Sequence, residues 1–403
     1  MANYILEGIR VVELASFIFG PAAGTVCGDF GADVIHIEPP GMGDPHRYLD
    51  KLKPLPACEM PYCWVLTGRG KKSIALNLKK EEGREVAREL VRRADVFITN
   101  FHPSVLEALQ MRWEDLGPLN PRLVYAHATG YGDVGDEVEK PGFDATAWWA
   151  RSGLMDAVRP GGGEYGLATP GMGDHPSAMA LFGAIMLALY DRERTGRGQR
   201  VRSSLIANGV WSNGLYVQAA LCGAEPFVPP THATTPNACV TPYVCSDGGA
   251  FYLAMVQEAQ QWGSLCDAVG RPELKDDPRF AELPARREHA AELVAILDEV
   301  FASRPLEEWR RDLDAHGVTF GVVAKSEDVP NDPQMQVNDL LRPIEGAAGL
   351  RTVDSPIKLD SAKRPAGKAP AIGEHTEEIL AELGYSAERI EALRGAGVVA
   401  APG

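Results

Sequence analysis

Segments typical of strands and of helices alternate through the first two hundred residues, and this alternation sets a strong limit on the fold. Short runs rich in Val and Ile, such as "IRVVEL" and "ADVIHIE", are typical of buried strands, and helical patterns such as "KEEGREVARELVRRA" separate them. Consecutive parallel strands need a crossover of helical length between them. We therefore predict an α/β fold with a large doubly wound domain, in which helices cover both faces of a parallel sheet.

The composition changes after residue 225. Residues 226–242 are rich in Pro and Thr and indicate a linker. A strand at "GAFYLAMV" and helices around 258–269 and 287–314 follow it. We predict three parts: a large domain over 1–225, a smaller α+β domain over 226–330, and a return to the large domain over 331–403.

Charge and cysteine content exclude several classes of function. The formal charge is −15, which argues against a nucleic-acid partner because phosphate binding needs a basic surface. The seven cysteines form no Cys-x-x-Cys pair and no cluster with histidines, so we expect reduced thiols and no metal site. The N-terminus lacks the layout of a signal peptide, and the apolar run 178–190 is too short for a bilayer. We expect a cytoplasmic protein without a membrane partner.

Two motifs fall where ligands bind in doubly wound sheets. "SFIFGP" stands at the carboxyl end of the first predicted strand, although the glycine fingerprint of dinucleotide-binding proteins is missing. Glu38 closes the second strand and is either a ribose ligand or a solvated strand-end acid. The cluster "GRGKK" at 68–72 is either a phosphate-binding loop or a solvated surface loop.

Two aspartates stand at predicted helix starts. Asp144 follows a Pro-Gly turn in "PGFDATAWWARSG" and begins an amphipathic pattern. Asp is a preferred N-cap, worth about 1 kcal/mol, and a helix N-terminus also keeps a nucleophilic carboxylate ionised. Asp174 is well placed to cap the next long helix, and with His175 it also permits an acid–base dyad. Spacing alone does not separate capping from catalysis.

In the order and spacing of its motifs, the chain resembles the class III CoA-transferase family, also called the formyl-CoA transferase or acyl-CoA transferase–carnitine dehydratase family. The likeness runs nearly the full length and is carried by "GIRVVELASFIFGP", "DFGADVIHIEPPGMGDPHR", "GRGKKSIALNLK", "DVFITNFHP", "NPRLVYAHATGYG", "PGFD", "RTGRGQRV" and "IGEHTEEILAELGYS". It implies a large Rossmann-like domain plus a smaller one, in a dimer of interlocked chains. A homodimer is expected, and a heteromer with a related subunit stays open.

The resemblance implies a nucleophile at Asp144 and CoA bound at the strand ends of the large domain. Formyl-CoA transferase has a glutamine and two arginines where Ile18, Pro39 and Ala108 stand. We therefore expect an acceptor other than oxalate, and Lys71, Lys72 or Arg69 as phosphate partners. The other implied CoA contacts are Ile18, Phe19, Leu76, Asn77, Leu78, Lys79, Asn100, Phe101, His102, Gly130 and Tyr131.

The resemblance also implies covalent catalysis. Asp144 would attack the thioester carbonyl of a donor acyl-CoA, giving a mixed anhydride and CoA thiolate. The thiolate would then attack the aspartyl carbonyl and leave an enzyme–CoA thioester, which an incoming carboxylic acid resolves by the reverse steps. The two thioesters have similar energies, so neither ATP nor a metal is needed. We expect a CoA thioester as substrate and no tightly bound cofactor.

Two other functions compete with transfer. α-Methylacyl-CoA racemases of the same family use a histidine before the aligned aspartate and a second acid about thirty residues on; here these positions hold Phe143 and Asp174. A phenyl ring accepts no proton, which disfavours the racemase. A non-catalytic subunit of a heteromeric transferase is the second alternative. Trp148 and Trp149 are either core aromatics or part of an acyl pocket, and we expect an aryl, branched or dicarboxylic acceptor acid.

Overall fold

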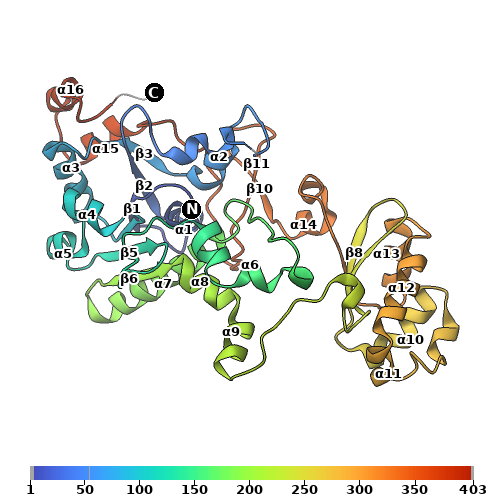
Figure 1. Ribbon diagram of the computed structural model, residues 1–403. Helices are drawn as coiled ribbons and strands as arrows, with labels where there is room; N and C mark the ends of the chain where they lie inside the picture. The colour runs from blue at the N-terminus through green and yellow to red at the C-terminus, as the bar shows by residue number, and fades with distance from the viewer. Residues whose placement is uncertain (1–3, 54, 401–403) are drawn as a thin grey trace. The chain divides into compact units, whose positions relative to one another are not determined.

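The structure, a computed structural model, describes residues 4–53 and 55–400 (Figure 1). The chain forms two compact units. The large unit comprises Met1–Asp156, Leu167–Cys222 and Gln334–Gly403, and the second comprises Ala157–Gly166 and Gly223–Pro333. Residues 157–166 belong to the second unit, so their assignment to the large domain was wrong: the backbone N–H of Gly161 donates to the carbonyl of Pro229 at 2.6 Å.

A six-stranded parallel sheet forms the centre of the large unit, which confirms the predicted α/β class. The strand order is β3-β2-β1-β4-β5-β6. Because the order reverses direction between β1 and β4, their carboxyl ends form the crevice where doubly wound sheets bind ligands. The strands are β1 (Arg10–Leu14), β2 (Asp33–Glu38), β3 (Lys72–Ala75), β4 (Val96–Thr99), β5 (Val124–Thr129) and β6 (Arg200–Ser204).

Helices cover both faces of this sheet (Figure 1). Alternate residues of each strand point to opposite faces, so Val11 and Val12 enter two different cores. Burial on both faces explains why the strands are almost continuously apolar. The first core lies under α1 (Phe19–Asp29), α7 (Asp174–Thr195) and α8 (Leu205–Ser212), and the second under α3 (Glu81–Arg92), α15 (Thr376–Glu382) and α16 (Ala387–Gly395).

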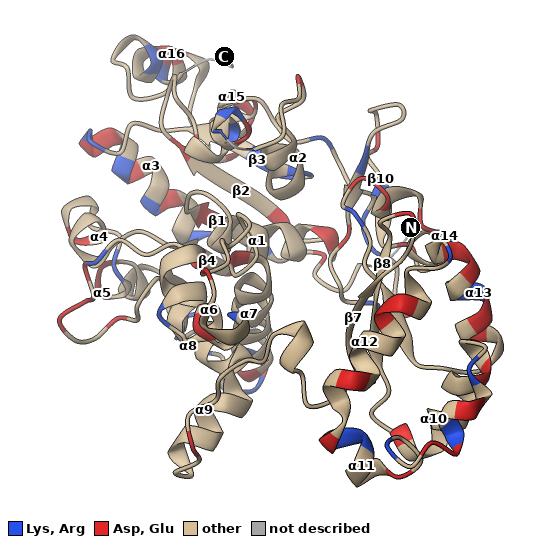
Figure 2. Cartoon of the chain, turned by 45° about the vertical axis from the view of Figure 1, so that its right-hand side comes forward, with Lys and Arg blue, Asp and Glu red and all other residues tan. Residues whose placement is uncertain are grey.

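α3 shows how an amphipathic pattern becomes a packed helix. Val86 and Leu90 are buried in the second core, whereas acidic and basic residues alternate along the rest of the helix (Figure 2). Shorter elements complete the unit: α2 (Tyr62–Gly68), α4 (Pro103–Leu109), α5 (Trp113–Leu116), α6 (Leu154–Ala157), α9 (Gly214–Leu221), α14 (Pro333–Val337), β10 (Leu341–Pro343) and β11 (Arg351–Val353).

The second unit is a small antiparallel sheet packed on helices. Its strands pair in the order β7-β8-β9, and its core holds Tyr243, Phe251, Phe301 and Trp309. The helix expected over 287–314 is interrupted at Pro305, which precedes the first turn of a new helix. The elements are β7 (Val240–Val244), β8 (Ala250–Ala254), α10 (Glu258–Ala268), α11 (Leu283–Glu288), α12 (Ala290–Phe301), α13 (Leu306–Ala315) and β9 (Phe320–Val322).

None of the helices in the described ranges has the length and apolar character needed to cross a bilayer.

Candidate active site

A cavity of about 270 Å³ lies at the carboxyl ends of β1, β2, β3 and β4. Ser16 lines it from the loop after β1, Pro39 from the loop after β2, and Val105 from α4. The segment after β3 and one residue after β4 complete the wall, so five of the expected CoA positions meet here: Leu76, Asn77, Leu78, Lys79 and Phe101. This is the crevice that the strand order predicts for a ligand.

The loop after β1 is held by side chains from two other elements. Asn100 accepts from the backbone N–H of Ser16 at 2.9 Å and donates to its carbonyl at 2.7 Å. Asp44 accepts from the N–H of Phe17 at 3.1 Å, and Phe17 has a left-handed φ of 63°. Ile18 is buried in the first core, and the ring of Phe17 is exposed.

The remaining expected CoA positions do not line this cavity. The side chain of Phe19 is buried in the first core, and His102 is the residue before α4. Gly130 and Tyr131 pack against the turn that precedes Asp144: a Cβ on Gly130 would lie 2.8 Å from the Cα of Gly142.

The basic cluster is not a loose phosphate loop, and the expectation was wrong for Lys71 and Arg69. The ammonium group of Lys71 is buried, 2.8 Å from Glu13. Arg69 is buried 2.8 Å from Asp29, and Lys72 pairs with Glu378 at 2.9 Å. Their charges are therefore already neutralised within the fold. The sequence could not reveal this, because the ion-pair partners lie far away along the chain.

Lys71 belongs to a buried network of charges behind the β1 loop. His36 contacts Glu13 at 3.0 Å and Asp44 at 3.4 Å. Burial alone would lower the pKa of His36, but hydrogen bonds to Asp44 and Glu13 and their charges raise it to about 9. The imidazolium of His36 thus links the ion pair of Lys71 and Glu13 to the carboxylate of Asp44, which accepts the hydrogen bond from Phe17.

Glu38 is part of the same interior and not a free ribose ligand. Its carboxylate accepts from Arg47 at 2.7 and 2.9 Å and from the N–H of Asp44 at 2.9 Å. Burial would raise the pKa of Glu38, but the bonds from Arg47 and the charge of His36 lower it below its ordinary value. The carboxylate therefore fixes the loop that carries Asp44.

Asp144 starts a π-helix, Asp144–Ala150, where the sequence suggested an α-helix. The N-cap is Phe143, so the capping alternative for Asp144 does not hold. The carboxylate of Asp144 is buried and accepts two backbone hydrogen bonds, from Ala145 at 2.8 Å and from Gly173 at 3.3 Å. The second bond joins Asp144 to the start of α7.

Asp174 is the first residue of α7 and not its cap, which is Gly173. No hydrogen-bond donor within residues 4–53 and 55–400 contacts the Asp174 carboxyl group, and the residue as a whole is half-buried. Burial of this carboxyl group and the negative charge of Asp144 raise the pKa of Asp174 to about 7. The structure therefore brings together two carboxyl groups with different surroundings, one held by amides and one unbonded.

His175 does not form the suggested dyad with Asp174. Its Nδ1 donates to the carbonyl of Gly171 at 2.9 Å, and burial lowers its pKa. The ring lines a second cavity, of about 680 Å³, whose wall is mainly apolar and includes Val26, Leu66 and Met179. This cavity lies within the large unit.

Trp148 and Trp149 are core aromatics. Both are buried, and their rings are stacked with centroids 6.1 Å apart. A Cβ on Gly173 would lie 2.6 Å from the ring of Trp148, so this glycine allows α7 to begin directly on the indole. In the described part of the chain, no group of three or more His, Cys, Asp or Glu side chains is arranged to hold a metal ion.

The fold and these motifs are those of one enzyme family. Residues 6–376 match the model of CoA-transferase family III, and the chain belongs to that family. It is 33% identical over 98% of its length, and 99% of the relative, to (R)-2-hydroxy-4-methylpentanoate CoA-transferase of Clostridioides difficile. It is 32% identical to cinnamoyl-CoA:phenyllactate CoA-transferase of Clostridium sporogenes, over 96% of each chain. A crystal structure of a CAIB/BAIF family protein from Brucella suis superposes with a TM-score of 0.85 at 31% identity, covering 94% of this chain and all (100%) of the other.

Proposed function

We propose that the protein transfers CoA from a donor acyl-CoA to an acceptor carboxylic acid through a covalent aspartyl intermediate. The observation that supports this most directly is the pair of carboxyl groups, Asp144 and Asp174, beside the β1 loop. A Cβ on Gly171 would lie 3.3 Å from Ile18 and 2.9 Å from His175. The start of α7 therefore packs on the loop whose Ser16 lines the crevice cavity.

The contacts of the two carboxyl groups favour Asp174 over Asp144 as the nucleophile, a revision of the sequence-based expectation. Both oxygens of Asp144 already accept backbone hydrogen bonds, and the group is buried. Asp174 is only half-buried, and its carboxyl group accepts no hydrogen bond from the described residues. Its raised pKa also makes its ionised form more basic, and hence more nucleophilic, than an ordinary aspartate.

In each proposed step the bond that forms is matched by one that breaks, and the charge balances. An oxygen of the Asp174 carboxylate attacks the thioester carbonyl, the C–S bond breaks, and CoA leaves as a thiolate. The thiolate attacks the aspartyl carbonyl of the anhydride and releases the donor's carboxylate. The acceptor carboxylate then attacks the aspartyl–CoA thioester, and the freed thiolate takes the acceptor's acyl group, which restores the carboxylate of Asp174. No step requires a bound cofactor, and we propose that none is tightly held.

The cavity of about 270 Å³ at the carboxyl ends of β1 to β4, the crevice cavity, is the proposed site for the nucleotide end of CoA. Leu76, Leu78 and Phe101 supply apolar wall for a flat base. Lys79 lines the cavity and is exposed, so it replaces Lys71 as the phosphate partner that we propose. The active unit is proposed to be an interlocked homodimer, as the family resemblance implies.

The named activities of the relatives suggest the acceptor class. Two relatives are named for acids with a branched or an aryl side chain, 2-hydroxy-4-methylpentanoate and phenyllactate. A human relative, 30% identical over 98% of this chain and 90% of its own length, is named for succinyl-CoA and glutarate. Racemisation is disfavoured by Phe143, whose ring accepts no proton. A silent subunit is disfavoured by the unbonded carboxyl group of Asp174.

Mass spectrometry of the trapped intermediate tests the proposal. The enzyme is incubated with acetyl-CoA or succinyl-CoA, digested, and searched for a CoA adduct. We expect the adduct on Asp174, its loss in Asp174→Asn, and turnover lowered on the order of 10³-fold in that variant. Asp144→Asn should still form the adduct. An adduct on Asp144 would reverse the assignment of the nucleophile, and an active enzyme with no adduct on either residue would overturn the covalent mechanism.

A further inference from the structure

Two exposed aromatic rings lie next to the carboxyl pair. Phe17 and Phe143 are 37% and 55% exposed, and their rings meet edge to face with centroids 6.1 Å apart and planes at 85°. Phe17 comes from the loop after β1, and Phe143 precedes Asp144 in the chain. The two rings together leave apolar surface exposed to solvent next to Asp144 in the chain, and exposed apolar surface that is contiguous is a candidate binding surface.

The backbone of Phe17 adds a second, independent observation. Its φ of 63° lies in the left-handed region, which is unfavourable for a residue with a side chain. Glycine would adopt this conformation without that cost. A bulky residue held in such a conformation beside a reactive group therefore points to a use for its ring.

Buried charges hold this ring in place. The carboxylate of Asp44 that accepts from Phe17 also accepts from the N–H of His46 at 2.9 Å and contacts the imidazolium of His36. Asn100 fixes the preceding residue in both directions. The backbone of Phe17 is therefore held by buried polar groups and not by the exposed loop alone.

We propose that the rings of Phe17 and Phe143, the aromatic pair, bind the hydrocarbon side chain of the acyl group and select aryl and branched acids over short or dicarboxylic ones. This inference rests on the proposed function and specifies its substrate class. The backbone N–H of Gly173 donates to Asp144. Because Phe143 precedes Asp144 and Asp174 follows Gly173, this bond brings Phe143 close to the start of α7. The two rings therefore lie near the start of α7, where Asp174 stands, and as uncharged apolar groups they offer no partner to a second carboxylate.

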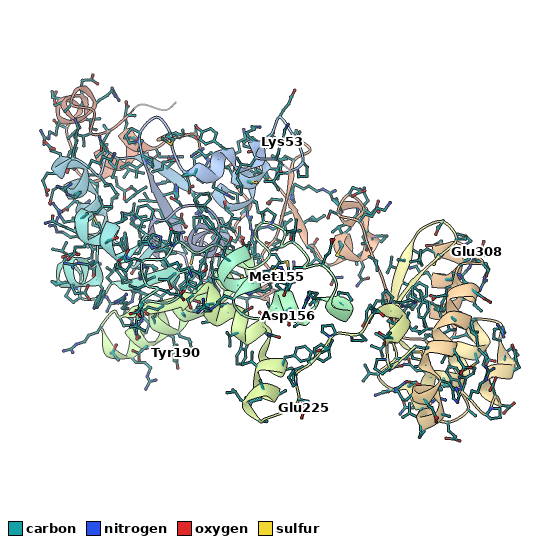
Figure 3. The ribbon with its side chains drawn as sticks, in the orientation of Figure 1. Lys53, Met155, Asp156, Tyr190, Glu225 and Glu308 are labelled. Atoms are coloured by element: carbon teal, nitrogen blue, oxygen red, sulfur yellow. The ribbon has the colours of Figure 1, made fainter. Side chains whose placement is uncertain are left out.

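Acceptor selectivity tests the aromatic pair. Phe17→Ala, Phe143→Ala and the double variant are compared with wild type, using acetyl-CoA as donor and phenyllactate, 4-methylpentanoate, propionate and succinate as acceptors. We expect kcat/KM for the aryl and branched acids to fall about tenfold or more, and that for propionate to change less than about threefold. Tyr190→Ala is the control, because Tyr190 is an exposed aromatic on α7 outside both cavities (Figure 3).

The outcomes separate this inference from the proposed function. If wild type forms a CoA adduct but the double variant keeps its selectivity, the inference fails and the proposed function stands. An equal loss for all four acceptors, with an unchanged thermal midpoint, would also overturn the inference. If wild type neither forms an adduct nor transfers CoA to any acid, the proposed function itself fails. Phe17→Leu and Phe143→Leu give the same comparison if an alanine variant does not fold, with retention of the branched acid and loss of the aryl acid expected.

Discussion

At Asp174, solvent exclusion and a neighbouring charge act in the same direction. Both favour the neutral acid and raise its pKa to about 7. A nucleophile at this position is then only partly ionised at neutral pH. Asp144, whose oxygens accept two amide hydrogen bonds, is the source of the neighbouring charge.

The raised pKa of Asp174 predicts that the rate of acyl transfer depends on pH. In wild type, kcat/KM should rise with pH through about 7, because the attacking form is the ionised carboxylate. Asp144→Asn removes the neighbouring charge and leaves the burial, so the midpoint should move to lower pH yet stay above the ordinary aspartate value. The measurement is a pH profile of acyl transfer for both proteins. A midpoint that does not move would mean that Asp144 does not act on the nucleophile.

Lys79 permits a second test at the residue scale. It is an exposed cation on the wall of the crevice cavity. Lys79→Ala should raise KM for the acyl-CoA roughly five- to tenfold, about 1–1.4 kcal/mol, with little change in kcat. Lys80→Ala is the matched control, because this neighbouring lysine bonds the carbonyl of Ala396 and does not line the cavity. Equal KM values in the two variants would place the phosphates elsewhere.

At the scale of elements, the buried charges join β1, β2 and the segment before β3. Lys71 and Glu13 are separated by 58 residues in sequence, and His36 connects them to Asp44. α1 passes so close to this network that a Cβ on Gly24 would lie 1.6 Å from the carboxylate of Glu13. A glycine is required there for the helix and the ion pair to coexist.

The buried network around His36 makes the free energy of unfolding fall as the pH rises. The pKa of His36 is raised to about 9 in the folded protein, above its ordinary value of about 6.5. Its stabilising contribution is therefore complete below about pH 6.5 and is lost as pH rises through 9, by an amount on the order of 3 kcal/mol. Urea unfolding at several pH values should show a steeper decline over this window for wild type than for His36→Gln. Parallel curves would show that His36 is not charged in the fold.

At the scale of the molecule, local patterns were enough for the fold class but not for the site. Alternating strand and helix patterns predict a doubly wound sheet because each crossover helix is encoded locally. The segment Leu76–Lys79 was expected at the CoA site from the family resemblance, and the strand pattern "KSIALNL" extends past Ala75, where β3 ends. The burial of Lys71 and the left-handed turn at Phe17 depend on Glu13 and Asp44, which only the tertiary structure brings into contact. For Asp174 the sequence left capping and catalysis both open, because it does not show which residue starts a helix.

The return of the chain to the large unit has a consequence for its synthesis. The backbone N–H of Asn77 donates to the carbonyl of Val398 at 2.8 Å, and Ile379 and Leu380 fill the core beside β3. Until residues 376–398 have been synthesised, the second core of the sheet lacks the cover that α15 and α16 provide. The small unit, most of which is one continuous stretch, can close earlier, so chaperones should engage the amino-terminal portion until α15 and α16 have emerged.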